Sequence, residues 1–237
     1  MLLNQQLKII DLKKDKNKME HIVKILKIDF VTHDTKSFIV EKPKNYKFVS
    51  GQATTMAINK PGLEKEKRPV TFSSTNENLV LELIIKKYPG GITEKIHELS
   101  PGDELIITDP FGVMHYKGEG IFFAGGAGIT PFLSIFRSLK NQNKINKNML
   151  IFSNKTAEDI INEKELANML GKNLILILTK EKKQGYESKR IDEQFIKDKI
   201  KAFNKQFYIC GPREFVSSIK EILQKLGAKK ESILIEG

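Results

Sequence analysis

"IFFAGGAGITPFLSIFRSL", residues 121–139, places a cluster of glycines between an apolar run and a segment with helical periodicity. This order predicts a buried strand, a tight turn and a helix. Gly126 and Gly128 would let a ligand approach the backbone, and the free N–H groups of a helix N-terminus favour an anion. Thr130 suits the N-cap of the helix and Pro131 its first position. We expect the turn to hold a pyrophosphate; a tight turn without a ligand is the alternative.

The chain before residue 118 has the pattern of an antiparallel β domain. Short β-rich runs alternate with turn residues such as Pro61-Gly62 and Pro101-Gly102, and one short helix is expected from Thr93. This rhythm predicts a small barrel or sandwich. The expected strands are HIVKILKIDF (21–30), KSFIVEK (36–42), TTMAI (54–58), RPVTFSS (68–74), LVLELIIKKY (79–88) and DELIITD (103–109).

From residue 118 onward, strands alternate with helices, which predicts a parallel, doubly wound α/β sheet of the Rossmann-like kind. The expected strands are 120–125, 148–153, 173–179, 205–211 and 232–236, and the expected helices 131–142, 157–170, 192–200 and 213–227. We therefore predict two domains, a β-barrel over 19–117 and an α/β domain over 118–237. The Lys-rich residues 1–18 are expected to form a disordered leader.

Composition narrows the function classes. The 237 residues contain one cysteine, Cys210, so an internal disulfide and a four-cysteine iron–sulfur cluster are both excluded, and a reducing cytoplasmic location is expected. The formal net charge of +11 favours an acidic partner, but the lysines are scattered and no nucleic-acid-binding motif is found. No apolar run reaches the roughly 18 residues of a membrane span. The four histidines lack metal-ligand spacing, so no metal site is expected.

Three further places carry candidate ligand-binding residues. Gly90 and Gly91 lead into the expected short helix, and Arg68 and Thr71 lie on a strand that precedes them. Ligands of open α/β sheets bind at the carboxyl ends of the strands, where Cys210 stands. Each place also has an ordinary reading: a plain glycine loop, a half-exposed strand, and an inert buried thiol.

Taken in order, the motifs "VSGQ", "RPVTFSS", "KKYPGGIT", "PGDELIITDPFG", "FFAGGAGITPFLSI" and "YICGP" resemble the ferredoxin–NADP reductase superfamily. The nearest likeness is to bacterial flavodoxin or ferredoxin reductase-like oxidoreductases, and "SNKTAEDIINEKEL" also resembles a segment of cytochrome b-type reductases. The resemblance implies FAD on the barrel and NADPH or NADH on the α/β domain. It implies electron transfer from the nicotinamide through the flavin to flavodoxin or ferredoxin. An electron-transfer subunit, or a reductase of free flavin, quinone or ferric acceptors, stays open.

The resemblance also implies individual roles. Arg68 would bind the FAD diphosphate, Thr71 would hydrogen-bond the hydride-accepting flavin nitrogen, and Cys210 would lie near the nicotinamide, which makes Thr71 and Cys210 the expected catalytic residues. The remaining expected FAD positions are Pro69, Val70, Lys86, Tyr88, Gly91, Ile92 and Thr93. The remaining expected nicotinamide-cofactor positions are Gly125, Gly126, Ala127, Gly128, Ile129, Thr130, Gly211 and Pro212.

The choice between NADPH and NADH depends on the end of the second α/β strand. Ser153 and Lys155 stand there and could hold a 2′-phosphate, although a solvated loop lysine is an ordinary feature. No acidic residue stands at that strand end to bind a free ribose hydroxyl. The sequence therefore leans slightly toward NADPH.

Overall fold

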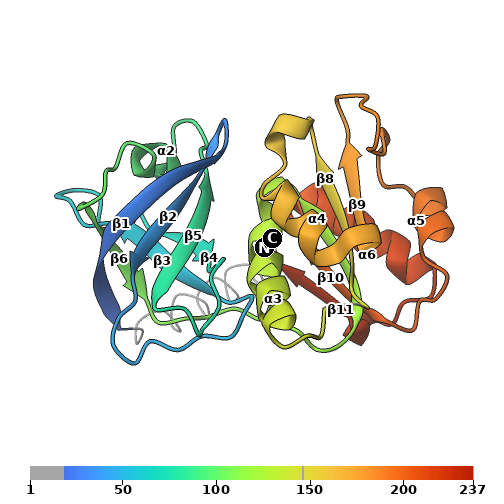
Figure 1. The fold of residues 1–237 in the computed structure, drawn as a ribbon, viewed down its shortest axis with the longest axis horizontal. Coiled ribbons are helices and arrows are strands. Elements are labelled where there is room, and N and C mark those ends of the chain that lie inside the picture. The colour runs from blue at the N-terminus through green and yellow to red at the C-terminus, as the bar shows by residue number, and fades with distance from the viewer. Residues whose placement is uncertain (1–18, 146, 237) are drawn as a thin grey trace, which may run out of the picture.

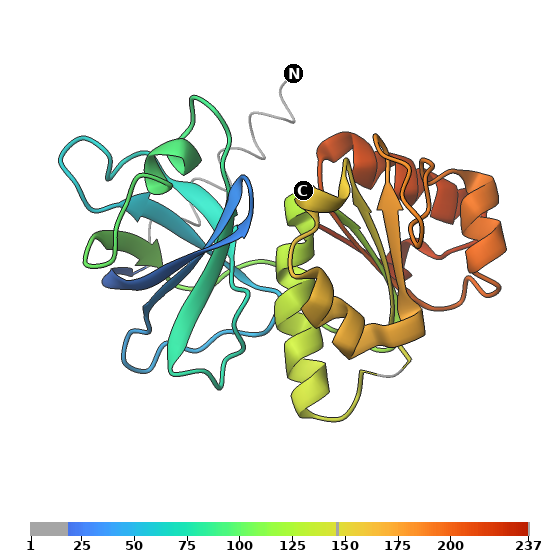
Figure 2. The ribbon, with the colours of Figure 1, turned by 45° about the horizontal axis from the view of Figure 1, so that its top comes forward.

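A computed structural model describes residues 19–145 and 147–236. The expected leader over 1–18 lies outside these residues. Figures 1 and 2 show two lobes side by side, with one helix, α3 (Thr130–Asn141), between them in both views. The predicted domain boundary at 117/118 falls in the segment between the last strand of the first lobe and the first strand of the second.

The first lobe confirms the antiparallel prediction. Its six strands lie in the order β4-β3-β6-β1-β2-β5, and every neighbouring pair is antiparallel. A bridge between Phe72 and Leu83 joins the two outer strands and closes the sheet into a barrel. The elements are β1 (Glu20–Thr32), β2 (Thr35–Glu41), β3 (Ala53–Ile58), β4 (Arg68–Thr71), β5 (Val80–Lys86), α2 (Ile92–Ile96) and β6 (Glu104–Thr108).

Alternation along the strands builds the barrel core. Val23 and Ile25 on β1 are buried, whereas Ile22 and Leu26, which flank them in sequence, are exposed, because successive side chains of a strand point to opposite faces. Phe72, directly after β4, is fully buried against the ring of Phe48. The core therefore anchors the chain directly after Thr71.

The second lobe is a parallel sheet in the order β11-β10-β7-β8-β9, as predicted. Its central strand is buried throughout because helices cover both faces. Helices α3 and α4 pack on one face, and α5 and α6 on the other. The elements are β7 (Gly120–Gly125), β8 (Met149–Asn154), α4 (Glu163–Leu170), β9 (Leu174–Leu178), α5 (Glu193–Lys199), β10 (Gln206–Cys210), α6 (Arg213–Lys225) and β11 (Ile233–Glu236).

Two local predictions are wrong. Thr130 is not an N-cap: a 3₁₀ turn, Gly126–Ile129, precedes α3, Thr130 already has helical dihedral angles, and its hydroxyl donates to the Ala127 carbonyl at 3.0 Å. The helix expected over 157–170 is interrupted, because Asn162 adopts a left-handed conformation with φ of 53° before α4 begins. Within the described residues, no helix has the length and apolar character required to cross a membrane.

Candidate functional site

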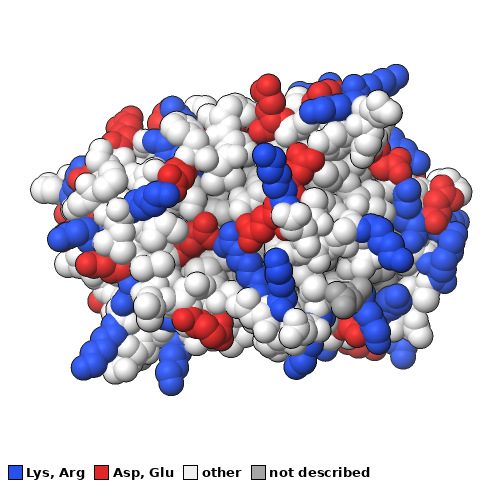
Figure 3. All heavy atoms as spheres, viewed as in Figure 1, with Lys and Arg blue, Asp and Glu red and all other residues white. Residues whose placement is uncertain are grey.

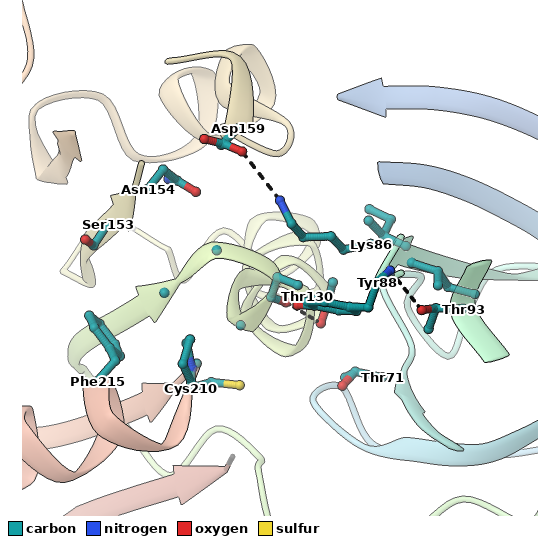
Figure 4. Close-up of a pocket in the computed structure, with 18 of the residues that line it drawn as sticks. Thr71, Lys86, Tyr88, Thr93, Thr130, Ser153, Asn154, Asp159, Cys210 and Phe215 are labelled. Atoms are coloured by element: carbon teal, nitrogen blue, oxygen red, sulfur yellow. Dashed lines mark hydrogen bonds and ion pairs between the residues drawn. The ribbon is translucent and has the colours of Figure 1, made fainter. Parts of the chain in front are cut away.

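A cleft of about 660 Å³ lies between the lobes, at the carboxyl edge of the parallel sheet (Figure 4). The structure gathers there most residues proposed from the sequence. From the barrel these are Arg68, Pro69, Val70, Thr71, Lys86, Tyr88 and Thr93, and from the α/β lobe Gly125, Gly126, Ala127, Gly128, Thr130, Ser153, Lys155, Cys210, Gly211 and Pro212. Gly91, Ile92 and Ile129 are not among the lining residues; both isoleucine side chains are buried.

Arg68 supplies an available cation on the barrel side of the cleft. Its side chain is exposed, its guanidinium lies 5.7 Å from the centroid of the Tyr88 ring, and it forms no ion pair within the described part of the chain. Tyr88 is itself 45% exposed. A guanidinium held by a ring with its donors free is suited to bind phosphate oxygens.

Lys86 spans the cleft rather than lining one side of it. Its ammonium lies 2.6 Å from the Asp34 carboxylate of the barrel and 3.5 Å from the Asp159 carboxylate of the α/β lobe. Burial opposes the charged form of Lys86, but the hydrogen bonds and charges of the two carboxylates outweigh it and raise the pKa. Lys86 is therefore a charged link between the two lobes at the cleft.

The loop before α2 is closed by Thr93. The backbone N–H of Tyr88 donates to the Thr93 hydroxyl oxygen at 3.0 Å, and the side chain is buried. Gly91 is the N-cap of α2, and Glu94 in its first turn accepts from the Gly90 N–H at 2.9 Å. The loop is thus shaped by its own hydrogen bonds.

Glycine is required at two positions of the 125–128 turn for different structural reasons. Gly126 has a φ of +52°, and a Cβ placed on it would meet nothing within 4 Å, so it faces open space. A Cβ on Gly128 would instead lie 2.3 Å from the Cys210 carbonyl oxygen. Gly126 is therefore the position that leaves room for a ligand, whereas Gly128 is required by contact with the neighbouring strand end.

Cys210 and Thr71 stand on opposite sides of the cleft. Figure 4 shows the Cys210 sulfur pointing toward the side where Thr71 lies. Burial, with the nearby Glu236 carboxyl, raises the pKa of the Cys210 thiol far above its usual range, so the thiol stays protonated. Glu236 pairs with Cys210 between β10 and β11, and burial raises its pKa to about 7.

Six lining residues were not found from the sequence: Ile84, Ile85, Asn154, Asp159, Thr179 and Phe215. Asn154 ends β8 and is 5% exposed, and both polar atoms of its amide lack a hydrogen-bond partner among the described residues. Asp159 reaches the cleft through a capping box in which it accepts from the Thr156 N–H and hydroxyl at 3.0 and 2.9 Å. The capping pattern Thr156-x-x-Asp159 is the sequence signal that could have placed this carboxylate.

Two family models match the chain in sequence. The oxidoreductase FAD-binding domain matches residues 11–116, and the oxidoreductase NAD-binding domain matches residues 122–221. NADH-cytochrome b5 reductase 2 of Pyricularia oryzae is 30% identical over an alignment of 241 positions, which covers 87% of this chain and 72% of the relative. The glycine betaine monooxygenase reductase subunit of Pseudomonas aeruginosa is 27% identical, with 87% of this chain and 61% of the relative covered.

A solved structure shows the same fold. The ferredoxin NADP+ reductase of Neisseria gonorrhoeae, with bound FAD and NADP, superposes with a TM-score of 0.81 at 20% identity. The match covers 92% of this chain and 98% of the other. The two-lobed fold is therefore shared across low sequence identity.

Proposed function

Because this chain belongs to the ferredoxin–NADP reductase superfamily of FAD- and NAD(P)H-dependent oxidoreductases, we propose that its cleft passes electrons from NADH, through FAD, to a separate one-electron carrier protein. One observation carries the proposal. Arg68 and Thr71 of the barrel line the same cleft as Gly126 and Cys210 of the α/β lobe, and Thr71 and Cys210 stand on its opposite sides (Figure 4). Binding of two cofactors face to face requires such an arrangement.

The lining residues suit both cofactors. Arg68 forms no ion pair with the described residues and could bind a diphosphate, and the turn at Gly126 leaves open space. The Asn154 amide, which has no hydrogen-bond partner among the described residues, has unused hydrogen-bonding capacity. When bound, the nicotinamide supplies a hydride and the flavin can release electrons singly. Thr71 would orient the flavin by a hydrogen bond. The protonated Cys210 would limit the approach of the nicotinamide ring by its shape and not by nucleophilic attack.

We infer NADH as the preferred donor, which reverses the slight lean of the sequence. Asp159 lines the same cleft as Ser153 and Lys155. Burial opposes its ionisation, but the Thr156 hydrogen bonds and the Lys86 charge lower its pKa, so the carboxylate is charged at neutral pH. A carboxylate near the strand ends can accept from a free ribose hydroxyl and repels a 2′-phosphate. The Lys155 side chain is exposed, so solvent can hydrate its ammonium group without a 2′-phosphate.

The proposed carrier is acidic. The net charge of +11 would attract it, although on the face shown in Figure 3 the Lys and Arg side chains are scattered, with Asp and Glu between them. Attraction would accelerate encounter and weaken with salt, since the Debye length is only about 8 Å at physiological ionic strength. The cytoplasm remains the proposed location, because a chain with one cysteine forms no internal disulfide.

Anaerobic titration tests the core of the proposal: the purified protein should be yellow, and NADH should bleach its flavin absorbance. In steady-state turnover, kcat/KM should be higher with NADH than with NADPH. Asp159→Asn should narrow that preference, and Lys155→Ala should leave it unchanged.

Turnover with an acidic ferredoxin or flavodoxin should fall steeply with salt, while turnover with a neutral quinone should barely change. Equal salt responses would refute the acidic carrier, and absence of bleaching would refute the reductase.

A second candidate is the reductase component of an oxygenase. It is favoured by the Pseudomonas aeruginosa relative, which is a monooxygenase reductase subunit and of which this chain spans 61%. With one cysteine the 237 residues cannot by themselves ligate a four-cysteine cluster, so in this candidate the flavin would pass electrons to a group held elsewhere in the oxygenase system. Sustained turnover with a soluble carrier alone would count against this candidate.

A further inference from the structure

Arg137, in the middle of α3, is bound by both lobes at once. Its Nε and Nη2 donate to the two carboxylate oxygens of Glu165, on α4, at 2.6 and 2.8 Å. Its Nη1 donates to the Ser73 carbonyl of the barrel at 2.8 Å and also pairs with the Glu82 carboxylate on β5. The guanidinium therefore joins a carboxylate of its own lobe to a carboxylate and a carbonyl of the other.

The partners of Arg137 are themselves held. The Ser37 hydroxyl donates to Glu82 at 2.9 Å, and the Asn162 amide donates to Glu165 at 2.6 Å. One turn before Arg137, the buried Ser134 hydroxyl donates to the Ser74 carbonyl at 2.7 Å. Side chains of α3 thus bind two consecutive carbonyls of the barrel. The three charged side chains of this network, Arg137, Glu82 and Glu165, are only 16–33% exposed. Charge-assisted, bidentate bonds of this kind fix geometry as well as contributing energy.

The bound carbonyls lie next to the barrel residues that face the cleft. Ser73 and Ser74 follow Thr71 by two and three residues, and the intervening Phe72 is fully buried. At its other end α3 begins at Thr130, directly after the glycine turn. Arg137 lies seven residues further along, about 10 Å at the usual rise of a helix. One helix therefore connects the turn on the sheet side of the cleft with the segment that positions Thr71.

We propose that Arg137 is a positioning residue whose bond to Glu82 sets the separation between the flavin and nicotinamide halves of the cleft. This inference rests on the proposed function. Hydride transfer needs reacting atoms about 3–3.5 Å apart, and a displacement near 1 Å can slow a reaction about a hundredfold. Loosening the contact between the lobes should therefore lower the rate of flavin reduction without removing any group that touches either cofactor.

The two carboxylates around Arg137 provide matched variants. Glu82→Gln weakens the bond between the lobes, and Glu165→Gln weakens the bond within the α/β lobe; each removes one charge next to the same guanidinium and preserves side-chain size. Arg137→Ala is less informative, because it leaves two half-buried carboxylates without their cation. Melting temperature and FAD content of both variants establish that each is folded and loaded.

The test is stopped-flow reduction of the FAD-loaded proteins by saturating NADH. Glu82→Gln should slow the limiting rate roughly tenfold to a hundredfold, with the Kd for NADH within about twofold, and Glu165→Gln should change the rate much less. A readout independent of activity is the distance distribution between spin labels at exposed Leu79 and Glu221, with Cys210 replaced by serine, which should broaden in Glu82→Gln alone.

Other results would overturn the inference. Equal slowing in both variants, in proportion to their loss of melting temperature, would make the network a stability element only. An unchanged rate in Glu82→Gln would remove Arg137 from positioning altogether. If the parent protein is not reduced by NADH or NADPH, the proposed function fails, and this inference fails with it. If the parent is reduced and Glu82→Gln is reduced at the parental rate, only the inference is rejected.

Discussion

Replacing Gly128 by alanine should disturb the protein through packing against its own backbone. The new Cβ would lie 2.3 Å from the Cys210 carbonyl oxygen, 2.5 Å from its carbonyl carbon and 2.7 Å from the Gly211 nitrogen. Ordinary contacts begin near 3.4 Å, so the turn and the end of β10 must separate by about 1 Å. All three atoms belong to the backbone, and no side-chain rotation relieves the contact.

This displacement gives the expected magnitude. Overpacking of well-packed sites typically destabilises by about 1–3 kcal/mol, so the urea unfolding free energy of Gly128→Ala should fall by that amount. Because Cys210 would move with β10, the rate of flavin reduction should fall as well. The matched control is Gly126→Ala, which meets no atom within 4 Å but has a φ of +52°.

Gly126→Ala should behave differently. Its left-handed backbone costs about 1–2 kcal/mol for a residue with a side chain, and its methyl group would occupy the space left for the cofactor. We expect weaker NADH binding in Gly126→Ala as its main kinetic effect, and a slower reduction rate in Gly128→Ala. The packing reasoning is refuted if Gly128→Ala unfolds within about 0.5 kcal/mol of the parent and reduces flavin at the parental rate.

Three other outcomes are expected. Thr71→Ala should retain FAD but slow its reduction, by an amount corresponding to the loss of one oriented hydrogen bond, about 1–3 kcal/mol; unchanged stopped-flow rates would contradict that role. Arg68→Ala should purify with less FAD because a phosphate contact is lost, whereas full flavin content by absorbance would remove Arg68 from FAD binding. Burial raises the pKa of Glu236 to about 7, above its unfolded value of 4.5, so its stabilising contribution is complete below about pH 4.5 and is lost as pH rises through 7. Parental unfolding free energy should therefore decrease from pH 5 to 8 by up to about 3 kcal/mol relative to Glu236→Gln, and parallel pH profiles would show that the carboxyl is solvated.

The sequence determined which elements form and which of their ends meet at the cleft. Alternating apolar residues such as Val23 and Ile25 are local signals of a half-buried strand, and the apolar run into Gly125 is a local signal of a buried parallel strand. Because parallel strands share a carboxyl edge, the sequence also placed Cys210 beside the glycine turn, and the structure brings them together. Local signals were insufficient where two choices compete, as at Asn162, whose left-handed conformation interrupts an otherwise helical pattern.

Only the tertiary structure decided what each residue contacts across the lobes. Asp159 lies 73 residues from Lys86, and Glu82 lies 55 residues from Arg137, so no local pattern pairs them. Gly126 and Gly128 belong to one turn, but only the tertiary structure shows why each must be glycine. Gly128 lies against the end of β10, whereas Gly126 faces open space. The hydrophobic periodicity of a segment indicates which of its residues are buried within its own lobe. The cleft depends on contacts between two lobes, and these contacts leave no periodic pattern in either segment.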